Sequence, residues 1–172
     1  LPQLIKMLKY LPWNIKLVCV GANFRPQPIP EWKAIETQLA LSDVAHRVIF
    51  LPEIKAGDFD SLATIYAEAR CYLQPSLYEG FGLPVLEAMH CQTPVVATQV
   101  ASLPEVGGEH ALYVQPSAES LAQGVKEVLA WSGRRRAEWL RQAYLWSEQF
   151  SLTQFARRTL QVYQSVLEQK SA

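Results

Sequence analysis

Short apolar runs alternate along the chain with longer segments in which apolar residues recur every three or four positions. The runs predict buried strands, and the longer segments predict amphipathic helices. Strands are expected at 15–20, 47–51, 70–73, 94–97 and 111–114. Helices are expected at 1–10, 31–41, 58–69, 117–131, 133–146 and 151–170, with a shorter helical turn at 103–105. Strands and helices that alternate in this way predict an α/β fold with a Rossmann-like, doubly wound parallel sheet that helices cover on both faces.

Three of the predicted helices begin at residues that commonly cap helices. Asp58 or Asp60 can cap the helix that ends near Ala69, and Ser117 can cap the helix that ends near Trp131. The last helix begins with a capping-box pattern, Ser151-Leu-Thr-Gln154. We see no repeat or internal boundary, so the sequence predicts one domain over residues 1–172, with 151–170 as its C-terminal helix.

The most informative stretch runs from Gln74 to His90 and reads as the end of a strand, a glycine-containing turn and a helix. Pro84 stands near the start of that helix, where a missing N–H costs nothing. Neither Gly82 nor Leu83 can cap the helix with a side chain. Because the first amides of a helix lack partners within it and its dipole favours negative charge, the sequence predicts an anion site at this turn.

Two carboxylates flank the turn, Glu79 in the loop and Glu87 about one turn into the helix. Beside a bound diphosphate, a carboxylate at about 4 Å is repelled by roughly 1 kcal/mol in water and about 4 kcal/mol at an effective dielectric constant of about 20. We therefore expect both to point away from the phosphates, toward hydroxyl groups, which suit an acceptor-only carboxylate. Backbone amides can bind a diphosphate, and the carboxylates on either side of them can bind the hydroxyl groups of sugars. This combination predicts a nucleotide-sugar site.

The motif E-G-F-G-L-P-V-L-E-A, followed by P-V-V-A-T, resembles the donor-binding half of the retaining glycosyltransferases of family 4, which have the GT-B fold. The resemblance covers nearly the whole chain, from Leu1 to about Tyr163. It implies the C-terminal half of a GT-B enzyme that transfers a hexose from a UDP- or GDP-hexose to an acceptor of open identity.

The resemblance also implies roles for individual residues. Glu87 would hold the ribose hydroxyls, and Glu79, the catalytic candidate, would hold the hexose hydroxyls. Backbone groups near Ile54 would meet the nucleobase, whereas Lys55 is better explained as a surface lysine than as a phosphate ligand. No cofactor or metal is expected, and Asp58 and Asp60 are explained by capping. The remaining donor-binding groups would be the backbone amides of Gly80, Phe81, Gly82, Leu83 and Val85.

The chain departs from the family pattern at several positions. Ala101-Ser102 stands where the family usually has two glycines, and His90 and Gln92 stand where it usually has small residues. His90 lies near a helix end, where a solvated or capping role is favoured over catalysis. The resemblance places the acceptor-binding domain and a basic pair that neutralises the diphosphate before the segment equivalent to Leu1. We therefore expect this chain alone not to transfer sugar.

Composition narrows the possible partners. The chain has 16 Lys and Arg and 16 Asp and Glu, and this zero net charge argues against a nucleic-acid binder that works through a basic field. The three cysteines, Cys19, Cys71 and Cys91, favour free thiols in a reducing compartment, so a cytoplasmic location is expected. No apolar run of about 18 residues is present. The full enzyme could still lie peripherally on a membrane.

Two alternatives stay open at the level of sequence. One is a GT-B nucleotide-sugar epimerase or phosphorylase, although the spacing of Glu79 and Glu87 favours the transferase. The other is a non-catalytic nucleotide-binding module. The apolar stripe of 151–170 adds a question of assembly, because it must pack on its own domain or on a second copy of the chain, which would give a dimer.

Overall fold

The computed structural model describes residues 1–54 and 57–170. Every predicted strand is present, although β1 begins two residues later than expected. The strands are β1 (Leu17–Val20), β2 (Val48–Leu51), β3 (Tyr72–Gln74), β4 (Val95–Thr98) and β5 (Ala111–Val114). The helices are α1 (Pro2–Met7), α2 (Pro30–Ser42), α3 (Phe59–Glu68), α4 (Leu83–His90), α5 (Leu103–Gly107), α6 (Ala118–Leu129), α7 (Gly133–Ser147) and α8 (Leu152–Lys170). Short 3-10 turns are η1 (Leu8–Tyr10), η2 (Ala45–Arg47), η3 (Gly108–His110) and η4 (Glu148–Phe150).

The strands pair in parallel, which confirms the α/β class, but they form two hydrogen-bonded ladders among the described residues. β1 pairs with β2, and β4 pairs with both β3 and β5. We expected one continuous sheet, and that part of the prediction is wrong. Leu17 and Cys19 of β1 pack in the same apolar cluster as Cys71, just before β3, and Leu73 of β3, so the two ladders share one core. An apolar run predicts that a strand is buried, but it carries no information about which strand lies next to it.

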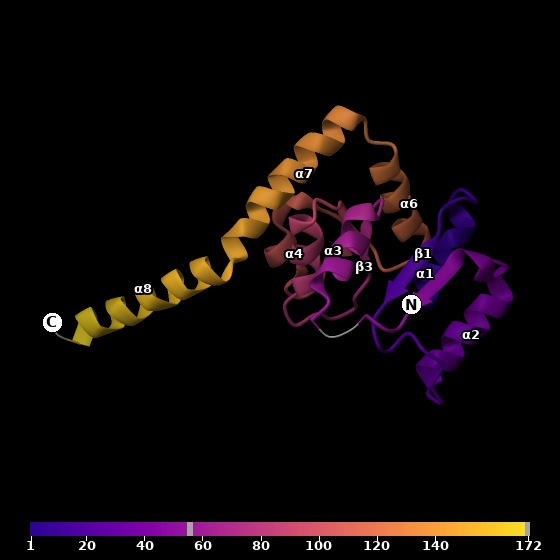
Figure 1. Cartoon of the computed structure of the whole chain (residues 1–172), viewed down its shortest axis with the longest axis horizontal. Coiled ribbons are helices and arrows are strands. Elements are labelled where there is room, and N and C mark those ends of the chain that lie inside the picture. Colours follow the sequence, from indigo (N-terminus) through magenta and orange to yellow (C-terminus); the bar gives the residue numbers. More distant parts are fainter. Residues whose placement is uncertain (55–56, 171–172) are drawn as a thin grey trace.

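Helices cover both faces of the three-stranded sheet. Val96 in β4 packs toward α6, where a Cβ atom on Gly124 would lie 2.8 Å from the Val96 side chain. Its neighbours Val95 and Ala97 point to the other face and join a cluster with residues of α4, α5 and α7. Since successive strand residues alternate between faces, β4 is buried along its whole length. Figure 1 shows α4 and α6 on different sides of this region.

The two-stranded sheet differs, because the described helices cover only one of its faces. Leu17 and Cys19 of β1 are buried against α1, α2 and α6. On the opposite face, Val18 is 43% exposed and Ile49 is 37% exposed. The predicted burial on both faces therefore holds for β3–β5 and not for β1–β2.

Helix capping follows the sequence closely. The Asp58 side chain accepts from the Ser61 amide at 3.0 Å, so Asp58 rather than Asp60 caps α3. The Ser117 hydroxyl oxygen accepts from the Ser120 amide at 3.2 Å and caps α6. Ser151 accepts from the Gln154 amide at 3.4 Å at the start of α8.

Helix α8 leaves the body of the molecule after η4 and projects away from it, so that the C-terminus lies far from the sheets (Figure 1). It does not fold back onto its own domain, so the intramolecular packing considered above does not occur. Its apolar side chains are exposed: Leu152, Phe155, Leu160, Val162, Tyr163, Val166 and Leu167.

Candidate functional site

The turn between β3 and α4 depends on one glycine. Gly82 is the N-cap of α4 and has a φ of 102°, in the left-handed region. A Cβ atom there would lie 2.9 Å from Cδ2 of the buried Leu103 side chain, so both conformation and space require glycine. Gly80 has nothing within 4 Å of such an atom.

The start of α4 carries no side-chain cap, as the sequence predicts. Pro84 stands in its first turn. The Val85 amide donates to the Gly82 carbonyl at 2.9 Å, so this N–H is already occupied and Val85 is a poorer ligand donor than we expected. The amides that remain for an anion are those earlier in the turn, of which Leu83 is the first helical residue.

Glu79 lies half-buried in the turn, and one of its oxygens is held by the protein. Oε2 accepts from the Gln74 amide nitrogen at 2.8 Å and from the Ser76 hydroxyl at 3.2 Å. Gln74 is the last residue of β3 and is buried. Within the described part of the chain, nothing hydrogen-bonds to the other oxygen of Glu79, so that oxygen can accept from a ligand.

Glu87 is exposed on the second turn of α4 and is held in the same manner. Its Oε2 accepts from the Tyr66 hydroxyl of α3 at 2.9 Å. Burial, with the neighbouring Tyr72 and Glu87, raises the pKa of Tyr66 above its ordinary value. The phenol therefore stays protonated and acts as the donor in this pair.

Glu87 lines a mainly apolar pocket of about 340 Å³ between α3, α4 and the segment that joins α7 to α8. Its lining includes Phe59, Leu62 and Tyr66 of α3, Leu83 and Leu86 of α4, and Phe150 of η4. Glu79 is not part of this lining. The structure thus places one carboxylate in the pocket and the other in the adjoining turn.

A second, wider hollow of about 840 Å³ lies around the proline-rich loop at 26–30 and the start of α2. It is larger than the pocket at Glu87, but neither motif carboxylate lines it. We assign the candidate site to the smaller pocket because that is where the uncapped helix start and Glu87 meet.

The loop after β4 supports the turn through residues that the sequence did not single out as functional. The Ser102 hydroxyl lies 2.9 Å from the Phe81 carbonyl and 3.2 Å from the Glu79 carbonyl. The Thr98 hydroxyl donates to the Ser76 carbonyl. Ala101, one of the positions where the resemblance has glycine, has a left-handed φ of 47°. Ser102 therefore replaces a glycine with a hydroxyl that fastens the turn.

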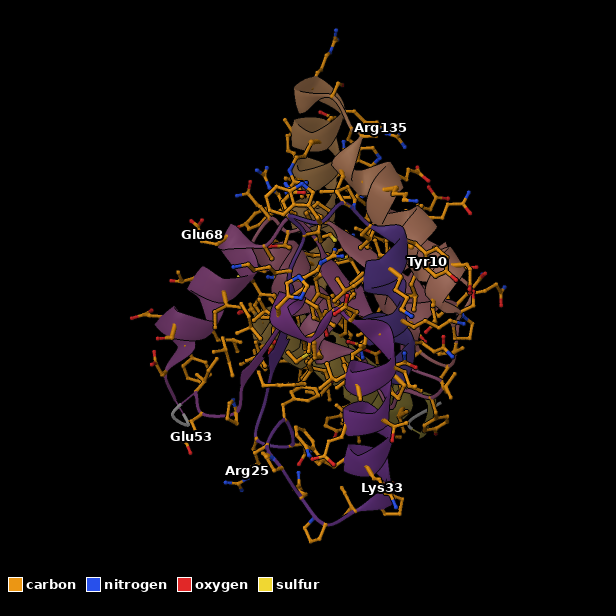
Figure 2. The ribbon with its side chains drawn as sticks, turned by 90° about the vertical axis from the view of Figure 1, so that its right-hand side faces the viewer. Tyr10, Arg25, Lys33, Glu53, Glu68 and Arg135 are labelled. Atoms are coloured by element: carbon orange, nitrogen blue, oxygen red, sulfur yellow. The ribbon has the colours of Figure 1, made fainter. Side chains whose placement is uncertain are left out.

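The loops after β1 and β2 meet each other, because the Gly21 amide donates to the Leu51 carbonyl at 3.0 Å. Figure 2 shows Arg25 and Glu53, from these two loops, toward one end of the molecule and Glu68 nearer the other. Ile54, expected near a nucleobase, is half-buried in the second of these loops. Lys55 lies outside the described residues.

His90 has a structural partner. Its Nδ1 lies 3.3 Å from Oε1 of Glu148, and its ring lies 5.0 Å from the ring of Tyr144. These contacts join the end of α4 to α7 and η4. Over residues 1–54 and 57–170, no group of three His, Cys, Asp or Glu side chains is placed to hold a metal ion. None of the described helices is long and apolar enough to cross a membrane.

An α/β fold with an uncapped helix start between two carboxylates is the arrangement that the motif implied. The sequence profile of the family described as "Glycosyl transferases group 1" matches residues 1–130. The chain therefore belongs to the group 1 glycosyl transferases, and its fold is that of GT-B enzymes.

Curated relatives agree with this family. O-antigen chain mannosyltransferase B of Escherichia coli is 39% identical over 60% of this chain and 27% of its own length. MMP alpha-(1->4)-mannosyltransferase of Mycolicibacterium hassiacum is 34% identical over 78% of this chain and 32% of its own length. Alpha-maltose-1-phosphate synthase of Mycolicibacterium smegmatis is 33% identical over 89% of this chain. The chain spans 41% of that last relative, so it corresponds to less than half of each of these proteins.

Solved structures agree with the fold. Sucrose-phosphate synthase of Thermosynechococcus elongatus matches with a TM-score of 0.79 and 28% identity over 97% of this chain and 42% of its own. Anabaena HepE, solved in complex with UDP-glucose, matches with a TM-score of 0.80 and 22% identity over 95% of this chain and 44% of its own.

Proposed function

We propose that this chain is the donor-binding, C-terminal half of a retaining glycosyltransferase of family 4. The whole protein would transfer a hexose from a nucleoside diphosphate hexose, UDP- or GDP-linked, to an acceptor. The observation that carries this proposal is the uncapped start of α4 between two carboxylates. Each has one oxygen held by the protein and, among the described residues, one oxygen without a hydrogen-bond partner. The mannosyltransferase names of the relatives and the UDP-glucose complex of HepE support it.

The diphosphate would lie against the turn amides of Gly80, Phe81, Gly82 and Leu83. The positive end of the α4 dipole favours an anion there, and no protein side chain competes for these donors as a cap. The held oxygens of Glu79 and Glu87 accept hydrogen bonds from the protein, which leaves the open ones for hydroxyl donors.

Glu87 would accept hydrogen bonds from the ribose, because it stands in the pocket with the apolar side chains of Phe59 and Leu62. Glu79, in the turn itself, would accept them from the hexose. The loop at Ile54 would supply backbone groups to the nucleobase. Glu79 is then the candidate for a catalytic role, since it would be the carboxylate next to the sugar that is transferred.

The reaction would be a same-face displacement, in which the leaving diphosphate helps to take the proton of the acceptor. Such a step depends on positioning and on stabilising charge as it develops on the leaving group. The amides at the α4 start would stabilise that charge without a metal. We place the reaction in the cytoplasm, supported by the free thiols of Cys19, Cys71 and Cys91.

Titration calorimetry of the chain with UDP and with GDP tests this function. We expect binding of one of the two, and we expect Glu87→Ala to weaken it by roughly 1.5–3 kcal/mol, the value of a hydrogen bond to a charged group. Glu79→Ala should leave free nucleotide binding unchanged and remove the preference for the sugar-bearing donor. Equal weakening of free nucleotide by both variants would show that the division of roles is wrong, and no binding of either nucleotide would exclude the function.

A further inference from the structure

Each carboxylate of the site is held at one oxygen by a side chain from a neighbouring element. We propose that Gln74 and Tyr66 are positioning residues, which set the open oxygens of Glu79 and Glu87 for the sugar and for the ribose. This inference rests on the proposed function. It adds two residues beyond the motif carboxylates, each of which acts by holding one of those carboxylates.

The amide of Gln74 is fully engaged. Its nitrogen donates to the Glu79 carboxylate and to the Ser76 hydroxyl, both at 2.8 Å. Its oxygen accepts from the Tyr72 hydroxyl. Gln74 is only 9% exposed, so water cannot easily replace these partners.

The Glu79 carboxylate decides which way the Gln74 amide faces, because a carboxylate can only accept a hydrogen bond and therefore requires the amide nitrogen on its side. The amide oxygen then faces the Tyr72 hydroxyl, which donates to it. Burial raises the pKa of Tyr72, so this donor keeps its proton. If the amide were turned over, its oxygen would meet the carboxylate, and two acceptors would be in contact. Glu79 is thus held in one orientation by a chain of two side chains, Tyr72 and Gln74.

Tyr66 is fixed by other contacts before it reaches Glu87. Its backbone carbonyl accepts from the Thr93 hydroxyl at 2.6 Å, which ties the end of α3 to the loop before β4. Its ring meets the ring of Tyr72 edge-on, with centroids 5.5 Å apart and planes at 71°. The hydroxyl therefore reaches Glu87 from a fixed position, and it restricts a side chain that would otherwise sample several rotamers on an exposed helix surface.

Removing the Tyr66 hydroxyl and removing the Gln74 amide should weaken the binding of different ligands. Without the Tyr66 hydroxyl, Glu87 is free to turn. Only ligands with ribose hydroxyls should then bind more weakly. Without the Gln74 amide, Glu79 keeps only the longer hydrogen bond from the Ser76 hydroxyl, at 3.2 Å, and can turn more easily. Only ligands with a sugar beyond the diphosphate should then bind more weakly. We expect each loss to be about three- to tenfold in affinity, since the carboxylate itself remains.

The first test compares UDP with 2′,3′-dideoxy-UDP, or the GDP pair if GDP is the better ligand, by titration calorimetry. Tyr66→Phe should weaken the nucleotide three- to tenfold and leave the dideoxy analogue unchanged. Tyr10→Phe is a matched control, because the Tyr10 hydroxyl donates to Glu119 at 2.5 Å between η1 and α6, outside the site. It should change neither affinity. Equal weakening of both ligands by Tyr66→Phe would reduce Tyr66 to a structural residue and overturn its role.

The second test compares the free nucleotide with UDP-glucose and GDP-mannose. Gln74→Met should reduce the advantage of the sugar-bearing ligand and leave free nucleotide binding unchanged, whereas Gln123→Met on the exposed face of α6 should change neither. If Gln74→Met does not fold, Tyr72→Phe provides the same test, because it releases the Gln74 amide. An unchanged sugar preference would overturn the role of Gln74. If the unmodified chain binds the ligands normally while these variants behave like it, only this inference fails. If the unmodified chain binds none of them, the proposed function fails as well.

Discussion

Gly82 shows how a single residue sets the geometry of the site. Its φ of 102° and the 2.9 Å approach of Leu103 leave no room for a side chain. We expect Gly82→Ala to lower the free energy of unfolding by about 1–3 kcal/mol, the usual cost of a residue held in an unfavourable backbone region. Urea denaturation measures this loss. Gly80→Ala is the control, because Gly80 has open space and no positive φ, and a change within about 0.5 kcal/mol is expected there. Similar losses in the two variants would contradict the steric explanation.

Cys19 is expected to make the free energy of unfolding fall as the pH rises above 9. Burial raises the pKa of this thiol from 9.0 to about 11. The folded state therefore keeps its proton in a range where the unfolded chain has lost it. The contribution of this thiol to the free energy of unfolding is present in full below pH 9 and is lost as the pH rises from 9 to about 11. The loss amounts to about 2–3 kcal/mol. Thermal melts between pH 8 and 11 should show a shallower decline for Cys19→Ala than for the unmodified chain. Parallel declines would exclude Cys19 as the source.

At the residue scale, the sequence identified the residues of the candidate site better than the residues that hold them. Glu79, Glu87 and the uncapped start of α4 follow from a local motif. Gln74 and Ser102 hold the motif through contacts 5 to 23 positions along the chain, and Tyr66 reaches Glu87 from another helix. Such partners depend on tertiary packing, so a polar residue at a strand end is the only sign of them in the sequence.

At the scale of elements, local patterns were more informative than long-range ones. Asp58, Ser117 and Ser151 cap helices as predicted, because a cap involves residues only three positions apart. The split between the β1–β2 and β3–β5 ladders was not predictable, since it depends on which strand edges meet in space. The exposed face of β1 was missed for the same reason: a run of apolar residues reads as buried on both sides.

Arg47 joins several elements and offers a test at this scale. It is 7% exposed, and its guanidinium donates to the Leu8 and Pro12 carbonyls at 2.7 Å and to the Ile15 carbonyl at 2.9 Å. These bonds close the segment between η1 and β1 over the start of β2. We expect Arg47→Met to lower the free energy of unfolding by about 3 kcal/mol, because one buried and two partly buried carbonyls lose their donors. Chemical denaturation measures the change.

The control for Arg47 is Arg134→Met at the exposed start of α7, where the expected change is within about 0.5 kcal/mol. Arg47 was treated in the sequence as the start of a strand, since nothing local distinguishes an arginine that binds carbonyls from one in water. A loss for Arg47→Met no larger than that for Arg134→Met would show that these carbonyls are satisfied in another way.

At the scale of the whole molecule, the chain corresponds to 27–41% of the curated relatives described above. We propose that the acceptor-binding part and the basic pair that neutralises the diphosphate lie in the remainder of such a protein. The purified chain should therefore bind nucleotide without transferring sugar, because we propose that the part that positions the acceptor belongs to the remainder. Incubation with UDP-glucose or GDP-mannose and simple glycoside acceptors, followed by mass spectrometry, checks this expectation. Any glycosylated product would contradict it.

Helix α8 determines how the isolated chain behaves in solution. Its exposed apolar side chains lie within one broad face of the helix. Phe155, Val162 and Val166 recur at spacings of seven and four residues, and Leu160 and Tyr163, three residues apart, lie beside them. Burying such a side chain is worth about 1.5–3 kcal/mol, so a face with several of them favours association once the concentration is high enough. The projection of α8 away from the body leaves this face accessible to a second copy (Figure 1).

We therefore expect the molar mass from light scattering to rise with concentration toward that of a dimer. Leu160→Glu, which places a charge within the apolar face, should keep the chain monomeric over the same range. Gln161→Glu adds the same charge on the polar side of α8 and should leave the association unchanged. Hydrogen exchange in α8 should slow with concentration in the unmodified chain and not in Leu160→Glu. A monomer at every concentration, with α8 unprotected from hydrogen exchange, would mean that this face stays exposed to solvent in the isolated chain. Equal effects of the two charged variants would mean that net charge, rather than the apolar face, controls assembly.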